Sequence, residues 1–446
     1  MAAHSQVDTL PIIWKGSPGY EQARVGRIFN HRRPDRYPIA VVEASTEQHI
    51  LDTAKLAAEK GCRVSVRSGG HSWAAWSVRD GAILLDLGNY KDLFYDAASG
   101  IVKCSPSTVG RDLNAYLKTH GRLFAGGHCP DVGNWGWACE MVKAIDVVTA
   151  DAQLLHCDEN QNSELFWAAR GAGPVTRFYL QTRPRPKIMM TSGYVYPTSE
   201  YRKAMGWITD VTINYDADTE IVAVASYPPG SDVIGILCLF TTFQETEEQA
   251  RIALQKAQET HPSGTTDEWN CKPTTLESEY EDQATANPNN HRYCADNAYI
   301  RNDADVVSVL EDAFTTLPHK KAFSLWYSMA PVSRRNLPDM ALSMQSDHYF
   351  ASYVVWEDEK DDQNCQKWSR DIFKEVEQHS EGAYLGDSDF QVRRTRFWGP
   401  EQGKKLMAIR KKWDSGGRIC GYLDADDKSQ AEGLPNEHEW QVSEKL

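Results

Sequence analysis

The chain has 446 residues, more than one ordinary core holds, so we expect two or three domains. Its 41% hydrophobic and 25% charged residues are typical of a globular protein, and a net charge of -14 argues against nucleic acid and anionic membranes as partners. No apolar stretch approaches the ~20 residues of a membrane span, and the N-terminus lacks the pattern of a secretory signal.

The cysteines point to a reducing compartment. Ten of them are spread over the chain without any C-x-x-C pair, which does not suit a disulfide framework. We therefore expect a cytoplasmic protein. A peroxisomal location is less favoured, because the chain ends in Glu-Lys-Leu and not in Ser-Lys-Leu.

The N-terminal part alternates strands and helices. The apolar run 39–42 predicts a buried strand, and Ser45 with Gln48 predicts a capping box at the start of a helix. A second strand, 62–66, runs directly into Ser68-Gly69-Gly70-His71. Further strands are predicted at 82–87, 101–104 and 144–149. This alternation is typical of an α/β unit.

The pattern changes after Pro184 and Pro186. Three apolar segments predict strands, with a helix over 201–211 between the first two and a helix capped by Thr246 and Gln249 after them. This order fits an antiparallel sheet backed by helices. Later strands are expected at 322–328 and 349–356, followed by a helix over 361–378. Boundaries are placed to give three parts: 34–185, 186–375 and 376–428.

Two glycine-rich stretches carry residues with chemical potential. In "GGHCPDVG", glycines precede Cys129 and Pro130 follows it, so the backbone there can come close to a bulky group. Cys129 is then a covalent anchor or a structural thiol. A zinc site with His128 and Cys139 matches no common spacing, and adjacent His and Cys side chains rarely face each other as a nucleophile pair needs. His71 either caps its loop or meets the edge of a flat cofactor.

The sequence resembles a flavoprotein family. "VRSGGHS" and "GGHCPDVG" are similar to the flavin-binding half of the vanillyl-alcohol-oxidase superfamily, which has a PCMH-type FAD-binding domain. "AIDVVTAD", "ELFWAARGAGP" and "RKKWDSGGRI" extend the similarity over nearly the whole chain, and the berberine-bridge-enzyme-like oxidases of fungi match best. The resemblance implies an α+β protein with a two-part FAD-binding domain over 34–185, a substrate domain over 186–375 and a C-terminal segment, 376–428, that returns to the FAD domain.

The resemblance also implies FAD held by two covalent bonds. His71 would bind the 8α-methyl group of the flavin, and Cys129 would bind ring carbon 6. Such bonds keep a flavin seated in a wide cleft and raise its redox potential, while the protein supplies orientation and electrostatics. Val147 corresponds to a position near the adenine end of FAD, or is a plain buried strand valine. The implied cofactor-binding residues are Arg67, Ser68, Gly69, Gly70, His71, Ser72, Cys129, Pro130, Val132, Gly133 and Val147.

The chain departs from the family in two places. Relatives continue after C-P-x-V-G with a second glycine-rich run, whereas here Gly133 is followed by "NWGWACE". A glycine-containing turn is also missing where Pro174 leads directly into "VTRF". Glycine-rich backbone that approaches a pyrophosphate is difficult to replace. Three interpretations stay open: a tighter loop rebuilt with Asn134, Trp135 and Trp137, a degenerate relative that holds flavin weakly, or an imperfect gene model.

Three residues are candidates for catalysis. Tyr384 occupies the tyrosine position of the family's Y-x-N motif, where Gly386 replaces the asparagine. A phenol acts as a base only if a positive charge stabilises its phenolate, and Arg393 and Arg394 are near in sequence. His348 and Tyr353 lie on opposite faces of the alternating segment "SDHYFASYVVWED", and one of these faces would line a cleft. All three also fit structural roles.

The sequence therefore predicts an FAD-dependent oxidase. A base would take a proton from a substrate O–H or N–H while hydride passes from the adjacent carbon to the flavin, and molecular oxygen would be the acceptor. The expected substrate is a small organic molecule: a secondary metabolite, an alcohol or a sugar. No metal is expected. A dehydrogenase with another acceptor stays open, and the alternative is a non-catalytic homologue with weak or no flavin binding.

Overall fold

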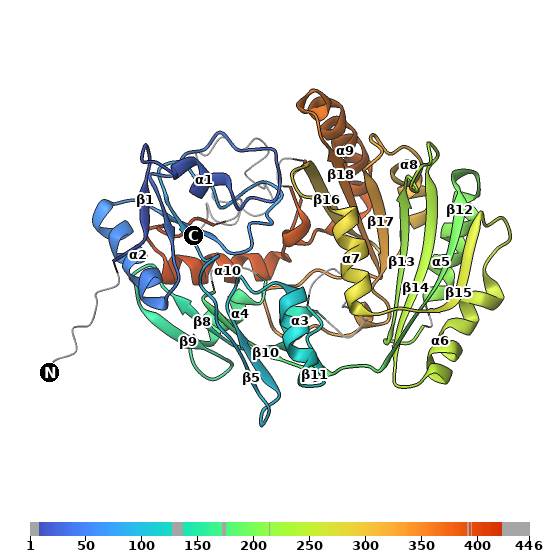
Figure 1. The fold of residues 1–446 in the computed structure, drawn as a ribbon, viewed down its shortest axis with the longest axis horizontal. Coiled ribbons are helices and arrows are strands. Elements are labelled where there is room, and N and C mark those ends of the chain that lie inside the picture. The colour runs from blue at the N-terminus through green and yellow to red at the C-terminus, as the bar shows by residue number, and fades with distance from the viewer. Residues whose placement is uncertain are drawn as a thin grey trace.

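The computed structural model describes residues 9–126, 137–171, 175–213, 215–389, 392–393 and 395–421. The chain forms two halves that lie side by side (Figure 1). One half contains the N-terminal strands and the last helix, α10 (Pro400–Trp413), and the other contains an eight-stranded sheet. No helix in the described part of the chain is long and apolar enough to cross a membrane.

The first sheet has four strands in the order β1-β2-β4-β3, with bounds β1 (Ile12–Trp14), β2 (Ala40–Glu43), β3 (Val64–Arg67) and β4 (Ile83–Asp86). The strands β2, β4 and β3 are parallel, and α2 (Glu47–Lys60) connects β2 to β3. The predicted capping box at Ser45 is wrong. Thr46 is the N-cap, because its hydroxyl accepts a hydrogen bond from the main-chain N–H of His49.

A second sheet completes the N-terminal half. Its strands lie in the order β5 (Leu93–Asp96), β6 (Ile101–Cys104), β10 (Arg177–Gln181), β8 (Val142–Val148) and β9 (Leu154–Cys157). All of its pairings are antiparallel, so the α/β pattern expected for this region applies only to the first sheet. The helices α3 (Gly110–Lys118) and α4 (Ser163–Ala169) pack their apolar side chains into its core.

The other half is built on one antiparallel sheet. Its strands are β15 (Asp267–Pro273), β12 (Ile188–Pro197), β14 (Gly235–Gln244), β13 (Thr219–Ser226), β17 (Phe323–Ser328), β18 (His348–Trp356), β16 (Arg292–Ile300) and β19 (Ser380–Gly382), in that order. The predicted antiparallel sheet is confirmed, although the sequence pattern predicts no strand at β16. The helices α5 (Tyr201–Thr212), α6 (Glu247–Thr260), α8 (Val306–Thr315) and α9 (Asp362–Val376) pack against one face.

The opposite face of this sheet meets the N-terminal half. Tyr293, Tyr349 and Tyr353 form a cluster there with Phe29 and Trp73. The chain then crosses back after β19, where α10 packs on α4. Beyond α10, Ile419 pairs with Val64 at the edge of the first sheet. Two bounds differ from the expected domains, since β1 begins before residue 34 and β19 extends the second half's sheet past residue 375.

Candidate active site

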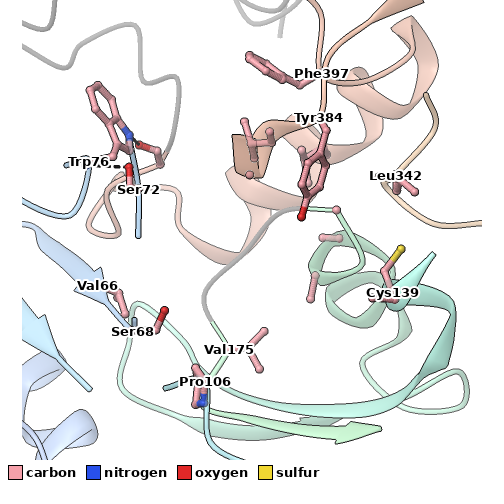
Figure 2. Close-up of a pocket in the computed structure, with 18 of the residues that line it drawn as sticks. Val66, Ser68, Ser72, Trp76, Pro106, Cys139, Val175, Leu342, Tyr384 and Phe397 are labelled. Carbon is pink, nitrogen blue, oxygen red and sulfur yellow. Dashed lines mark hydrogen bonds between the residues drawn. The ribbon is translucent and has the colours of Figure 1, made fainter. Parts of the chain in front are cut away.

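A cavity of about 920 Å³ lies between the two halves (Figure 2). This volume is near the upper end of the usual range for small-molecule sites. The N-terminal half lines it with the loops 68–72, 106–109 and 147–150, and α10 adds apolar side chains. The eight-stranded sheet and the loop after β19 form the remaining walls. The cavity therefore has a floor from one half and a roof from the other.

Arg67 anchors the base of the glycine-rich loop. Its side chain is 1% exposed, and its Nε and Nη2 atoms lie 2.9 and 2.5 Å from Asp86 Oδ2. The same guanidinium donates to the main-chain carbonyls of Ala23 and Arg24. Burial lowers the Arg67 pKa to about 10, which still leaves the side chain charged. Because these bonds use the N–H groups of the fork, Arg67 positions the end of β3.

The loop after Arg67 has a defined shape. Gly70 has a φ of +79°, and a Cβ there would lie 1.8 Å from the carbonyl oxygen of Arg27, so no other residue fits. The His71 ring stacks on Phe29, with centroids 5.1 Å apart and planes 14° apart. Ser72, which follows His71, accepts a hydrogen bond through its hydroxyl from the main-chain N–H of Trp76 at 3.1 Å.

The protonation state of His71 suits a covalent bond between an imidazole nitrogen and a carbon atom. His71 is exposed to the cavity, but desolvation by the surrounding protein, together with the positive charge of Arg27, lowers the pKa of its imidazole. The ring is therefore neutral at physiological pH and keeps a nitrogen lone pair. A neutral ring is the form that can attack an electrophilic carbon or bind to one covalently.

The expected cofactor residues gather at this cavity. Ser68, Gly69, Gly70, His71, Ser72 and Val147 all line it. Cys129, Pro130, Val132 and Gly133 lie outside the described residues, as do Asn134, Trp135 and Pro174. Trp137 and Val175, which follow the two undescribed segments, both line the cavity.

The donors and apolar groups present suit FAD. Hydroxyls at Ser68, Ser107 and Thr108 line the N-terminal side, with the guanidinium of Arg410 from α10, and such groups bind a pyrophosphate. Trp76, Phe397 and Trp398 give apolar surface for flat rings. Among the described residues, no cluster of histidine, cysteine or acidic side chains could hold a metal ion.

Tyr384 points into the cavity from the loop after β19 (Figure 2). Asn297 on β16 clamps its main chain, because Asn297 Nδ2 donates to the Tyr384 carbonyl at 2.8 Å and Asn297 Oδ1 accepts from its N–H at 2.6 Å. The Arg393 guanidinium donates to Asp296 Oδ2 at 2.8 Å and to Glu377. Its charge is therefore neutralised inside the protein by these two carboxylates. Arg394 lies outside the described residues.

Three further tyrosines that line the cavity were not predicted from the sequence: Tyr299, Tyr327 and Tyr349. Tyr349 on β18 donates from its hydroxyl to Asp387 Oδ2 at 2.7 Å, and its ring lies 5.5 Å from that of Tyr299 on β16. Burial, supported by the Asp387 charge, raises the pKa of both phenols well above the usual value. Both therefore stay protonated. The alternation along β18 contained the signal, but it did not show which face meets the cavity.

The structure does not bring the other two catalytic candidates to the cavity lining. His348 faces the helix-covered side of the sheet, where its Nδ1 accepts from Trp326 Nε1 at 3.3 Å. Tyr353 is on the same face as Tyr349, yet its ring stacks on Phe323 at 4.9 Å. Both side chains thus have packing partners in the described structure.

The fold and the cavity define a flavoprotein: an FAD-binding domain of PCMH type joined to a substrate domain, as in berberine-bridge-enzyme-like oxidases. Residues 38–125 match the family model of an FAD binding domain. Berberine-bridge-enzyme-like 1 of Physcomitrella patens superposes with a TM-score of 0.77 at 18% identity, covering 96% of this chain and 98% of that one. The 6-hydroxy-D-nicotine oxidase of Arthrobacter nicotinovorans gives a TM-score of 0.78 at 15% identity, covering 94% and 98%.

A curated relative is closer in sequence. The FAD-linked oxidoreductase nodO of Hypoxylon pulicicidum is 36% identical over 445 residues, which span 95% of this chain and 99% of that protein. The chain belongs to this family of FAD-linked oxidoreductases, with the fold of the berberine-bridge-enzyme-like oxidases.

Proposed function

We propose that the protein is an oxidase that carries FAD bound covalently through His71 and Cys129. Its substrate would be a small organic molecule, such as a secondary metabolite, an alcohol or a sugar, and dioxygen would be the acceptor. The observation that carries this proposal is that the loop with His71 and the side chain of Tyr384, from different halves of the molecule, line one cavity. The structural neighbour from Arthrobacter nicotinovorans is an oxidase, which supports the proposal.

Bound FAD would supply the acceptor for a hydride from a substrate carbon, and dioxygen would take up the electrons. The chain's residues would hold it at the 68–72 loop, where the neutral imidazole of His71 has a free lone pair. Tyr384 is the group we propose to take the substrate's O–H or N–H proton, since of Tyr384, His348 and Tyr353 it alone lines the cavity. Asp296 and Glu377 neutralise Arg393, so the positive charge that stabilises the phenolate would have to come from a cation other than Arg393. The Asn297 clamp fixes where that hydroxyl lies.

Anaerobic reduction of the purified protein tests this function. A panel of alcohols, amines and sugars is mixed with the protein, and bleaching of the flavin band is followed by stopped flow. At least one compound should bleach the band, and air should restore it with formation of hydrogen peroxide. Tyr384→Phe should slow bleaching roughly 100-fold or more, as expected for loss of a general base.

Tyr353→Phe is the matched control, because Tyr353 is buried in the same half outside the cavity lining. It should bleach at the rate of the unchanged protein. Equal rates for Tyr384→Phe and the unchanged protein would remove Tyr384 from this role. A reduced flavin that persists in air would indicate a dehydrogenase.

A further inference from the structure

The wall that the second half contributes to the cavity is apolar. Its side chains include Tyr327, Met329, Val332, Leu342 and Met344. Among the described lining residues of this half, none has a charged or amide side chain. A substrate bound against this wall would find few polar partners, so the wall selects for apolar surface.

Three of the hydroxyl groups on the same wall already have partners. The hydroxyl of Ser333 donates to Asp347 Oδ1 at 2.6 Å, and that of Ser388 donates to Asp296 Oδ1 at 3.0 Å. The Tyr349 hydroxyl is similarly bonded to Asp387. These groups are held by the protein itself, which leaves them poorly placed to recognise a substrate.

Tyr299 is different. Its side chain is 1% exposed, it lines the cavity, and its hydroxyl has no hydrogen-bond partner among the residues that the structure describes. Its surroundings include the cavity-lining residues Tyr384 and Cys139, which act electrostatically on the phenol. A buried hydroxyl without a partner is unfavourable and uncommon in native proteins. A ligand group in the cavity would supply the missing bond.

We infer that the substrate is a largely apolar, uncharged molecule, such as a fused-ring alcohol, whose polar group pairs with the Tyr299 hydroxyl. The inference rests on the proposed function and narrows its substrate class. A sugar carries a hydroxyl on nearly every carbon, and this wall would leave those groups without partners. A site of this kind rejects such a ligand through the cost of unpaired polar groups.

Isothermal titration calorimetry on the flavin-containing protein tests the inference with three ligands: 1-tetralol, tetralin and cellobiose. We expect 1-tetralol to bind at least tenfold more tightly than cellobiose. Tyr299→Phe should weaken the binding of 1-tetralol about threefold to tenfold, which is the effect of one hydrogen bond. It should leave the affinity for tetralin unchanged, because tetralin has no hydroxyl. Met329→Asp should weaken the binding of both 1-tetralol and tetralin more than tenfold. Val233→Asp is the control, since Val233 is 63% exposed and does not line the cavity.

The inference is overturned if cellobiose binds as tightly as 1-tetralol, if no ligand of the three binds, or if Met329→Asp binds 1-tetralol normally. If Tyr299→Phe loses the same factor in affinity for 1-tetralol and for tetralin, the proposed role of Tyr299 is overturned. Visible absorption of the same samples reports whether flavin is present. Failure of the substrate class is thereby distinguished from failure of the oxidase function, because calorimetry requires no turnover.

Discussion

Replacing Asn297 should loosen the loop that carries Tyr384. Asn297 is fully buried, and its side-chain amide makes two hydrogen bonds to the Tyr384 main chain, at 2.8 and 2.6 Å. Each such bond contributes roughly 0.5–1.5 kcal/mol, and a buried main-chain group left without a partner costs more. Asn297→Ala should therefore lower the free energy of unfolding by about 2–3 kcal/mol. Since the bonds end on Tyr384, the loss should be greatest around that residue.

Amide hydrogen exchange measured on a peptide spanning residues 380–389 checks the location of the effect. A local loss of about 2 kcal/mol corresponds to roughly 30-fold faster exchange. Leu254→Ala is the matched control, because Leu254 is fully buried on α6 and its truncation costs about 2–5 kcal/mol in a different part of the core. If both variants accelerate exchange in this peptide equally, or Asn297→Ala leaves it unchanged, the clamp does not hold Tyr384.

Three further predictions concern residues that support the walls of the cavity. Gly70→Ala should lower stability by more than about 3 kcal/mol in urea unfolding, because its Cβ would overlap a main-chain carbonyl; Gly61→Ala, also at positive φ but with open space, should cost only about 1–2 kcal/mol. Asp86→Asn leaves a buried guanidinium without its anion and should cost about 3 kcal/mol by the same assay. Burial raises the pKa of Asp347, but hydrogen bonds, above all from Arg334, lower it overall. The ionised Asp347 therefore stabilises the folded protein above the pKa of the unfolded chain, near 4, and this contribution is lost as the pH falls through the lower pKa of the folded state. In Asp347→Asn, the free energy of unfolding should consequently change less with pH in this acidic range.

The sequence predicted the elements whose patterns are local. Alternation identified β18 and the helical period identified α5, each with nearly the observed bounds. The start of α2 was displaced by one residue, because Ser45 and Thr46 are both good caps and only the backbone conformation decides between them. The strand β16 was missed because it is buried on both faces, and residues such as Asp296 and Asn297 interrupt its apolar run.

The site was predictable to the extent that its residues follow one another in the chain. The loop from Ser68 to Ser72 could be recognised from its glycines and its place after a strand. Tyr299 and Tyr349 could not, since their cavity position depends on which face of the sheet meets the N-terminal half. That arrangement depends on contacts between segments far apart in the sequence. Tyr353 shares its face of β18 with Tyr349, and what separates them is position along the strand: Tyr349 lines the cavity, whereas Tyr353 packs on Phe323.

The central claim is covalent FAD, and an absorption spectrum before and after acid precipitation tests it most directly. The account predicts a yellow protein whose colour stays in the pellet. In a His71→Ala, Cys129→Ala double variant, any remaining colour should move to the supernatant. A yellow supernatant from the unchanged protein would contradict the covalent bonds, and a colourless preparation would contradict the assignment of a flavin oxidase to this chain.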